Sequence, residues 1–344
     1  MKAIRVGVIG VGNMGRNHCR VFSSLRCAEL VGVCDLDQER GRQIARQYEV
    51  DFYPEVDQLL EKVDAVSVAT TTQAHFDLAM HCLEQGIHVF VEKPLTETVE
   101  QAEILSKSAA TCPLVVQAGH IERFNPTYTE LLNVLEDMHV LAISFRRLSA
   151  FQGSNTDVDV ISDLMIHDLD LALHMVQRDP VSINASGLTA FSQAIDHTVA
   201  HLHFHGGPLL TLTASRITEQ KVRSIEVMAT EAFVEANLLN KTISVHRRTL
   251  GEYVHQNHRG VKYRQESIIE CIHVPAFEPL YLELEHFVDC IARGNSPQVT
   301  AEDGLKALGL AEAIRKSLEV QRIDAAPTSW KPHPAPADMV MAAA

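Results

Sequence analysis

The stretch IRVGVIGVGNMG, residues 4–15, decides the fold of the first half of this chain. Its apolar first half predicts a buried β-strand, and a helical pattern follows from about residue 14 to residue 25. Between them, Gly10 permits a tight turn, Gly12 lets the backbone approach a pyrophosphate, and Gly15 lets the helix pack closely on the strand. The helix N-terminus then offers unpaired N–H groups to phosphates. The motif predicts dinucleotide binding, although a six-residue glycine pattern is a weak signal by itself.

An acid at the end of the next predicted strand supports this interpretation. The strand covers about 30–34 and ends in Asp35, about 20 residues past the last glycine, where a ribose-binding acid is expected. Asp35 could also be the N-cap of the following helix, and it could have both roles. No arginine follows directly, because Leu36 and Asp37 come next, and a carboxylate here repels a 2′-phosphate. The sequence therefore favours NAD over NADP as the cofactor.

Strand and helix patterns continue to alternate through the first half of the chain. We expect further strands over 65–69, 89–91 and 114–118, with helices near 74–84 and 99–109. This alternation predicts a doubly wound parallel sheet. The turn TTTQAH, residues 70–75, lies at the same rim of the sheet as the glycine loop, and its hydroxyls could contact the cofactor or cap a helix.

The segment VFVEKP, residues 89–94, ends an apolar strand in a charged pair followed by proline. In open α/β sheets, ligands bind beyond the carboxyl ends of the strands, so Glu92 and Lys93 are expected to face a ligand. Pro94 biases Lys93 toward an extended conformation, which would aim its ammonium group reproducibly. The alternative is an ordinary solvated lysine at a strand end.

Beyond about residue 138 the pattern changes to strands without long helices between them. β-Branched residues and period-two alternation predict strands over 140–148, 182–191, 199–204, 209–214, 224–229 and 242–246. These strands predict an α+β domain with a large open antiparallel sheet. His201, His203 and His205 alternate along one strand, but no nearby cysteine or carboxylate completes a metal site. We therefore expect no metal, and a sheet face that joins subunits in a homodimer or homotetramer.

One polar helix, predicted over about 162–176, interrupts this sheet. At about 100° per residue, Asp163, His167, Asp170 and His174 share one stripe. An ordinary amphipathic helix would turn such a stripe to water, yet this one lacks the Lys and Arg usual on a solvated face. An Asp at i and a His at i+4 can hydrogen-bond, which would orient the imidazole as a general base.

Length and composition suit a two-domain protein of 344 residues. Hydrophobic residues make up 46% of the chain without a membrane-length apolar run, and Met1-Lys2 leads directly into a strand, so we expect a cytoplasmic protein that contacts no membrane. The seven scattered cysteines are expected to be free thiols. A net charge of −14 argues against nucleic acid as a partner.

We expect two domains, over 1–124 and 125–330. The second should end in helices near 281–293 and 302–321, and a disordered Pro- and Ala-rich tail is expected over 331–344.

Taken together, the glycine loop, Glu92-Lys93-Pro94 and the pattern Asp163-x-x-x-His167-x-x-Asp170 resemble the Gfo/Idh/MocA family of sugar and inositol oxidoreductases. The resemblance runs from about residue 3 to residue 323 and includes Gly294-Asn295-Ser296-Pro297 near the end. It implies that Lys93, Asp163 and His167 form the catalytic group. The chain departs from many members at Met165-Ile166, where they have a glycine, and this leaves the shape of the pocket open.

Within this family, two segments are most similar to UDP-N-acetylglucosamine 3-dehydrogenases: GHIERFNP, residues 119–126, and DLMIHD, residues 163–168. The resemblance implies oxidation of the sugar 3-hydroxyl, with NAD as acceptor, to a 3-keto sugar. A separate pyridoxal-phosphate aminotransferase then converts that ketone to an amine for lipid A, in lipopolysaccharide biosynthesis.

Two alternatives to this function stay open. The substrate could be UDP-N-acetylglucosaminuronate, inositol or another polyol, or the protein could be a regulator of the same fold without turnover.

The predicted binding residues follow from these motifs. The cofactor residues are Gly10, Gly12, Asn13, Met14, Gly15, Asp35, Thr70, Thr71, Thr72, His75, Glu92, Lys93 and Gln117. The substrate residues are Lys93, His120, Arg123, Asn125, Arg147, Asp163 and His167. Arg123, Arg146 and Arg147 could hold a diphosphate bidentately, but ion pairing explains these arginines equally well.

Overall fold

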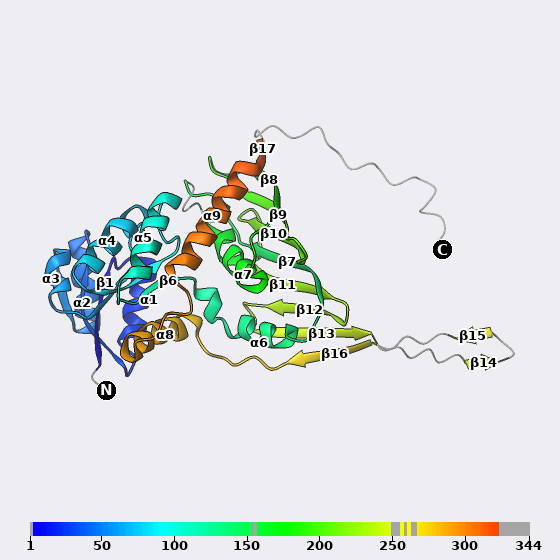
Figure 1. Ribbon diagram of the computed structural model, residues 1–344, viewed down its shortest axis with the longest axis horizontal. Coiled ribbons are helices and arrows are strands. Elements are labelled where there is room, and N and C mark those ends of the chain that lie inside the picture. The colour runs from blue at the N-terminus through cyan, green and yellow to red at the C-terminus, as the bar shows by residue number, and fades with distance from the viewer. Residues whose placement is uncertain are drawn as a thin grey trace.

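A six-stranded parallel sheet forms the first half of the computed structural model, which describes residues 3–151, 153, 157–248, 255–257, 260–262 and 267–322 (Figure 1). Its strands are β1 (Ile4–Ile9), β2 (Ala28–Cys34), β3 (Asp51–Tyr53), β4 (Ala65–Val68), β5 (His88–Glu92) and β6 (Val116–Gly119). The order β3-β2-β1-β4-β5-β6 changes direction between β1 and β4, where doubly wound sheets bind nucleotides. The predicted parallel sheet is confirmed.

Helices cover both faces of this sheet, and one of them comes from the far end of the chain. The local helices are α1 (Asn13–Phe22), α2 (Gln38–Tyr48), α3 (Val56–Leu60), α4 (Thr72–Glu84) and α5 (Val99–Thr111). α8 (Pro279–Arg293) packs against α1 and β1, and its Phe287 lies edge-on to Phe90 of β5 at a ring-centre distance of 5.8 Å. The two halves of the chain therefore share a core, and a domain boundary near residue 124 stays a prediction.

The second half is built on a nine-stranded sheet in the order β16-β13-β12-β11-β7-β10-β9-β8-β17. Its strands are β7 (Val140–Leu148), β8 (Ser182–Thr189), β9 (His197–His203), β10 (Leu209–Ser215), β11 (Val222–Ala229), β12 (Ala232–Asn237), β13 (Thr242–Arg248), β16 (Ser267–Ile272) and β17 (Leu318–Arg322), and β14 (His255–Asn257) pairs separately with β15 (Gly260–Lys262). Most neighbours run antiparallel, as predicted. β7 with β10 and β8 with β17 run parallel, because helices intervene before the chain returns to the sheet.

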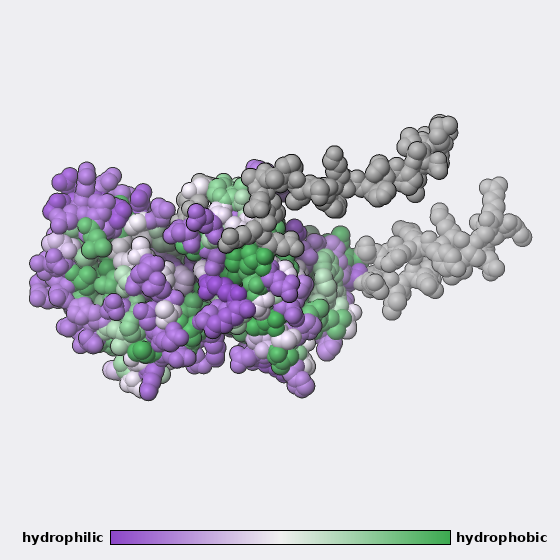
Figure 2. Space-filling view, turned by 90° about the horizontal axis from the view of Figure 1, so that it is seen from above, coloured by the Kyte–Doolittle hydropathy of each residue, from purple (hydrophilic) through white to green (hydrophobic). Residues whose placement is uncertain are grey.

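The helices α6 (Pro126–Leu135), α7 (Ile166–Val176) and α9 (Ala301–Ser317) lie between the two sheets (Figure 1). The inner face of the second sheet carries fully buried side chains such as Phe145, Ile225 and Val227, which pack with these helices in one core. The outer face carries exposed side chains, including Leu209 and Met228. Seen from above, hydrophilic residues gather at the end of the molecule formed by the first sheet and its helices (Figure 2).

Three details of the fold differ from the sequence expectation. The helix expected over 302–321 ends at Ser317, because Leu318–Arg322 pairs as an edge strand beside β8. Several elements were not anticipated from the sequence pattern, namely α3, α6, β3, β12 and β16. His205 lies past the end of β9, so of the three predicted histidines His201 and His203 share the exposed strand face. The tail over 331–344 lies outside the described residues.

No helix among the described residues is both long enough and apolar enough to cross a bilayer. Cys19, Cys27, Cys34, Cys82, Cys112, Cys271 and Cys290 are free thiols, as expected.

Candidate active site

The glycine loop between β1 and α1 has the backbone that a pyrophosphate requires. Gly10 has φ +83°, which side-chain-bearing residues rarely adopt, and a Cβ on Gly15 would lie 1.8 Å from the Gly10 oxygen. Gly12 is the N-cap of α1 without a side-chain cap, and nothing lies within 4 Å of the place where its Cβ would be. The start of α1 is therefore open to an anion.

A cavity of about 780 Å³ adjoins this loop at the carboxyl ends of the strands. Of the predicted cofactor residues, its lining includes Gly10, Gly12, Asn13, Met14, Asp35, Thr70 and Thr71. Thr71 is the N-cap of α4 but its side chain caps nothing, which leaves its hydroxyl for a ligand. Leu36 lies fully exposed at this cavity, a position suited to an adenine ring. The lining, the open backbone and the helix start fit a dinucleotide.

The remaining predicted cofactor residues do not line this cavity. Thr72 begins α4, and buried His75 places Nδ1 2.9 Å from the Pro94 oxygen and Nε2 3.3 Å from the Thr70 oxygen. His75 therefore links the threonine turn to the turn that carries Lys93. Gln117 is fully buried, and its side-chain amide donates to the backbone carbonyl of Glu283 in α8 at 3.2 Å.

Asp35 is held by four hydrogen bonds, two of them from an arginine that the sequence reasoning missed. Its carboxylate accepts from the backbone amides of Val11 at 2.7 Å and Asp37 at 2.8 Å, and from Arg40 Nε at 3.2 Å and Nη2 at 2.7 Å. Burial acts to raise the pKa of Asp35, but Arg40 and the two amides outweigh it and lower that pKa. Asp37, rather than Asp35, caps α2. The cap at Asp37 was the available signal for Arg40, because it places residue 40 on the first turn, facing back to β2.

Lys93 and the π-helical turn η2 (Ile161–Met165) meet between the two sheets. Lys93 Nζ donates to the Asp163 backbone oxygen at 2.8 Å and lies 3.5 Å from its Oδ1. Burial, followed by the positive charges of Lys93 and Arg147, holds the pKa of His167 well below its ordinary value. Burial also lowers the pKa of Lys93, against the opposing effect of Asp163 and Glu92. The site thus combines a lysine at a carboxylate with a neutral imidazole able to accept a proton.

The hydrogen bond expected between Asp163 and His167 is absent from the described structure. Within it, His167 Nδ1 is buried without a partner, and Asp163 turns to Lys93 instead. The physical reason is η2, whose wider π-helical turn ends the 3.6-residue spacing before α7 begins. His167, Asp170 and His174 still share one face of α7, but Asp170 binds Arg123 and His174 Nδ1 lies 2.6 Å from the Tyr128 hydroxyl.

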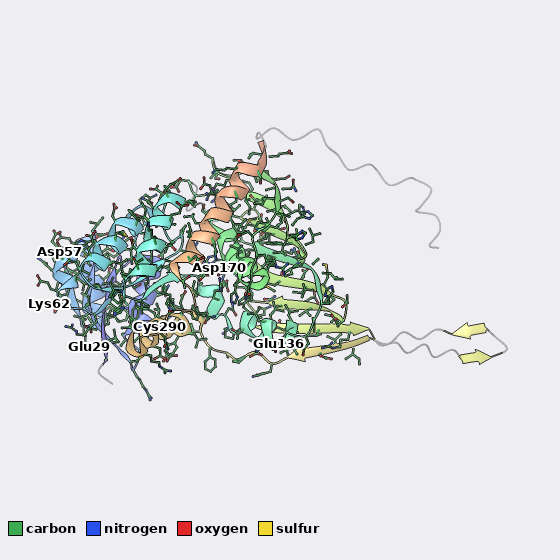
Figure 3. All side chains as sticks on the ribbon, viewed as in Figure 1. Glu29, Asp57, Lys62, Glu136, Asp170 and Cys290 are labelled. Atoms are coloured by element: carbon green, nitrogen blue, oxygen red, sulfur yellow. The ribbon has the colours of Figure 1, made fainter. Side chains whose placement is uncertain are left out.

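The arginines suggested for a diphosphate are engaged in ion pairs. Arg147, 2% exposed, binds Asp168 at 2.7 Å and Glu122 at 2.8 Å, and Arg123 binds Asp170 at 2.7 Å in the middle of the molecule (Figure 3). This placement favours the ion-pair interpretation of both residues. Arg146 faces the opposite side of β7 and is half-exposed, near Glu226.

The other two predicted substrate residues, Asn125 and His120, are buried. Asn125 caps α6 and donates to Glu122 at 2.9 Å. Neither ring nitrogen of His120 has a partner within the described part of the chain. Asn125 thus has a structural role beside the site. His120 stays a predicted substrate-binding residue, because its ring nitrogens are unpaired.

A buried chain of polar groups lies directly behind Lys93. Glu92 Oε1 lies 2.9 Å from His18 Nε2, and His18 Nδ1 lies 2.7 Å from Ser67 Oγ. Glu92 is thus buried rather than turned to the cofactor. Glu283 of α8 is fully buried, and its carboxyl oxygens have no hydrogen-bond partner among the described residues. Burial, together with the charge of Glu92, raises the pKa of Glu283 well above its ordinary value.

This raised pKa predicts a stability effect with a definite sign. From the unfolded pKa of about 4.3 up to the folded pKa, only folded Glu283 keeps its proton, so wild-type stability falls by up to about 1.4 kcal/mol per pH unit. Glu283→Gln has no proton to lose, so we expect the variant to gain stability relative to wild type as pH rises from 5 to 8. Thermal denaturation of both proteins over that range measures the difference.

The control is Glu285→Gln, which changes a partly exposed acid on the same helix. It should show no such pH-dependent gain. A constant difference between Glu283→Gln and wild type across pH 5 to 8 would mean that Glu283 is charged in the folded protein.

Two family models match the chain. Residues 4–120 match the oxidoreductase family model with an NAD-binding Rossmann fold, and residues 147–235 match the GFO/IDH/MocA C-terminal domain.

Among curated relatives, UDP-N-acetylglucosamine 3-dehydrogenase of Acidithiobacillus ferrooxidans is 31% identical over 92% of this chain and 97% of its own. Myo-inositol 2-dehydrogenase of Thermotoga maritima is 27% identical over 93% and 97%. A solved structure of the Acidithiobacillus ferrooxidans enzyme has a TM-score of 0.84 at 31% identity, covering 92% of this chain and 98% of that one. The chain therefore belongs to the Gfo/Idh/MocA family of oxidoreductases, and its first sheet is an NAD(P)-binding Rossmann fold.

Proposed function

We propose that this protein oxidises the 3-hydroxyl of UDP-N-acetylglucosamine to the 3-keto sugar with NAD as acceptor. The observation that carries the proposal is the contact of Lys93 with Asp163 near a neutral His167, whose pKa the charge of Lys93 depresses, in a chain whose glycine loop adjoins a cavity that fits a dinucleotide. The 31% identity to a UDP-N-acetylglucosamine 3-dehydrogenase over nearly the whole chain favours this substrate. The wider class, dehydrogenation of a sugar or polyol hydroxyl, is shared by the inositol-oxidising relatives.

The residues divide the work between cofactor and substrate. Bound NAD supplies the hydride acceptor. Gly12 and the start of α1 would hold its pyrophosphate, while Asp35 and Arg40, which line the same cavity, would face its adenosine ribose. The protein places the substrate carbon toward that acceptor and handles the hydroxyl proton itself.

Lys93 and His167 act on the same hydroxyl oxygen. Lys93 hydrogen-bonds that oxygen and stabilises the negative charge that develops as the proton leaves. His167 takes the proton, and its depressed pKa keeps it unprotonated and ready at neutral pH. Asp163 positions Lys93 through the contacts at 2.8 and 3.5 Å, a role different from the orientation of His167 first expected of it.

The kinetic test is a pair of substitutions at these residues. His167→Asn keeps much of the shape but removes proton acceptance, so kcat should fall by about 10²- to 10⁴-fold with the affinity for NAD nearly unchanged. Lys93→Met should also reduce kcat rather than NAD binding. Because both residues act on one oxygen, the double variant should be less impaired than the product of the single defects. NADH formation from UDP-N-acetylglucosamine measures all three.

The matched control is His174→Asn on the same helix. The His174 ring lies within hydrogen-bond distance of the Tyr128 hydroxyl and has no assigned role in the reaction. Its kcat should stay within a few-fold of wild type. Near-normal turnover in His167→Asn would remove the general base from the mechanism.

Cofactor choice is the second test, and it rests on Asp35. Its carboxylate should oppose a 2′-phosphate, so we expect NAD to bind at least about tenfold more tightly than NADP, or roughly 1.4 kcal/mol. Asp35→Ser should narrow this gap. Arg40→Gln should widen the difference in affinity between NAD and NADP, because the guanidinium of Arg40, 2.7 Å from Asp35, offsets the negative charge of the carboxylate. Titration of each variant with both dinucleotides measures the ratio, and equal or tighter NADP binding in wild type would take Asp35 out of this role.

Two wider proposals follow from the same function. The 3-keto sugar is a substrate for a pyridoxal-phosphate aminotransferase, which would consume the product in lipid A biosynthesis. The outer face of the second sheet, with exposed Leu209 and Met228, supports a contact between subunits of a homodimer or homotetramer.

A further inference from the structure

Arg223 lies beside the catalytic group and was not singled out by the sequence. It stands on β11 directly opposite Arg147 of β7, on the inner face of the second sheet. Farther along that face, Ile225 and Val227 are fully buried, so the sheet ends in two arginines where the hydrophobic core stops. Arg147 is 2% exposed, whereas the Arg223 side chain is 33% exposed.

The neighbouring carboxylates are already engaged by other donors. Asp168 accepts three hydrogen bonds from Arg147 at 2.7 to 3.1 Å, and Glu122 accepts from Arg147 and from Asn125. Arg223 comes no closer than 3.6 Å to Glu122, its ion-pair partner among the described residues. Its positive charge is therefore only partly compensated.

This charge acts on the catalytic residues themselves. Arg223 contributes to the depressed pKa of His167, after burial and the charges of Lys93, Arg147 and His120. Burial and Arg147 lower the pKa of Arg223 itself, and the acids Glu122, Asp168 and Asp163 oppose that effect. A second anion beside Arg223 would therefore stabilise its guanidinium, and Arg binds phosphate or carboxylate bidentately.

We infer that Arg223 binds an anionic group of the substrate while Lys93 and His167 act on its hydroxyl. The inference rests on the proposed function and sharpens it, because it makes the enzyme selective for a charged sugar over a neutral polyol. The anion has two possible sources on a nucleotide sugar, the diphosphate on C1 or a carboxylate at C6 of a uronate. A neutral polyol such as inositol supplies neither and would leave Arg223 uncompensated.

The test compares Arg223→Gln with wild type on UDP-N-acetylglucosamine, UDP-N-acetylglucosaminuronate and myo-inositol, with NADH formation as the signal. We expect KM for the charged sugar to rise by about 10- to 100-fold while kcat changes only a few-fold. The dissociation constant for NAD should not change. Arg223→Lys, which keeps the charge but not the fork, should recover part of the loss.

The control variant is Arg146→Gln, an exposed arginine on the opposite face of the adjacent strand, whose kinetics should match wild type. An equal rise in KM for both nucleotide sugars identifies the diphosphate as the bound anion. A rise for the uronate alone identifies the carboxylate.

The two proposals fail in different ways. Unchanged KM for both nucleotide sugars in Arg223→Gln, with an active wild type, overturns the role of Arg223 and leaves the proposed function standing. A wild type that oxidises the uronate alone, with KM dependent on Arg223, overturns the proposed substrate and supports the inference. A wild type active only on myo-inositol overturns both.

Discussion

The contact between Lys93 Nζ and Asp163 is the interaction on which the site depends. It joins the carboxyl end of β5, in the first sheet, to the π-helical turn that precedes α7, in the second half of the chain. β5 is held by the core of the first half and the π-helical turn by the core of the second half. The contact between Lys93 and Asp163 therefore fixes the position of one half relative to the other. The same turn releases His167 from Asp163 and leaves its imidazole next to the lysine's charge.

Around this contact, buried charges form a rigid frame. Arg147 with Asp168 and Glu122, and Arg123 with Asp170, are each desolvated and hydrogen-bonded, an arrangement that is costly to break and therefore tied to one geometry. α8 crosses from the second half to the Rossmann fold and brings Glu283 behind Glu92. Beside this buried frame, four charged or titratable side chains stay partly exposed: Lys93, Asp163, His167 and Arg223.

The sequence predicted what local pattern determines and missed what depends on distant contacts. Gly10 and Gly15 act through the backbone of their own loop, so their geometry followed from spacing alone. Asp163 and His167 were placed on one α-helical face, and the π-helical turn could not be seen in a 3.6-residue pattern. Arg223 and Glu283 take their significance from partners far along the chain or across a sheet, whereas Arg40 was missed although its partner Asp35 lies five residues away. The sequence pattern predicted that α9 continues through residues 318–322. In the structure these residues form β17, because they pair with the edge of β8.

The central claim is that Lys93 and His167 converge on one sugar hydroxyl across the two halves of the protein. A crystal structure of the protein with NAD and UDP-N-acetylglucosamine tests it most directly. The account predicts that the sugar C3 faces the nicotinamide, with its hydroxyl oxygen within hydrogen-bond distance of both Lys93 Nζ and the His167 ring. A sugar bound with another carbon at the nicotinamide, or with the 3-hydroxyl out of reach of either residue, would contradict it.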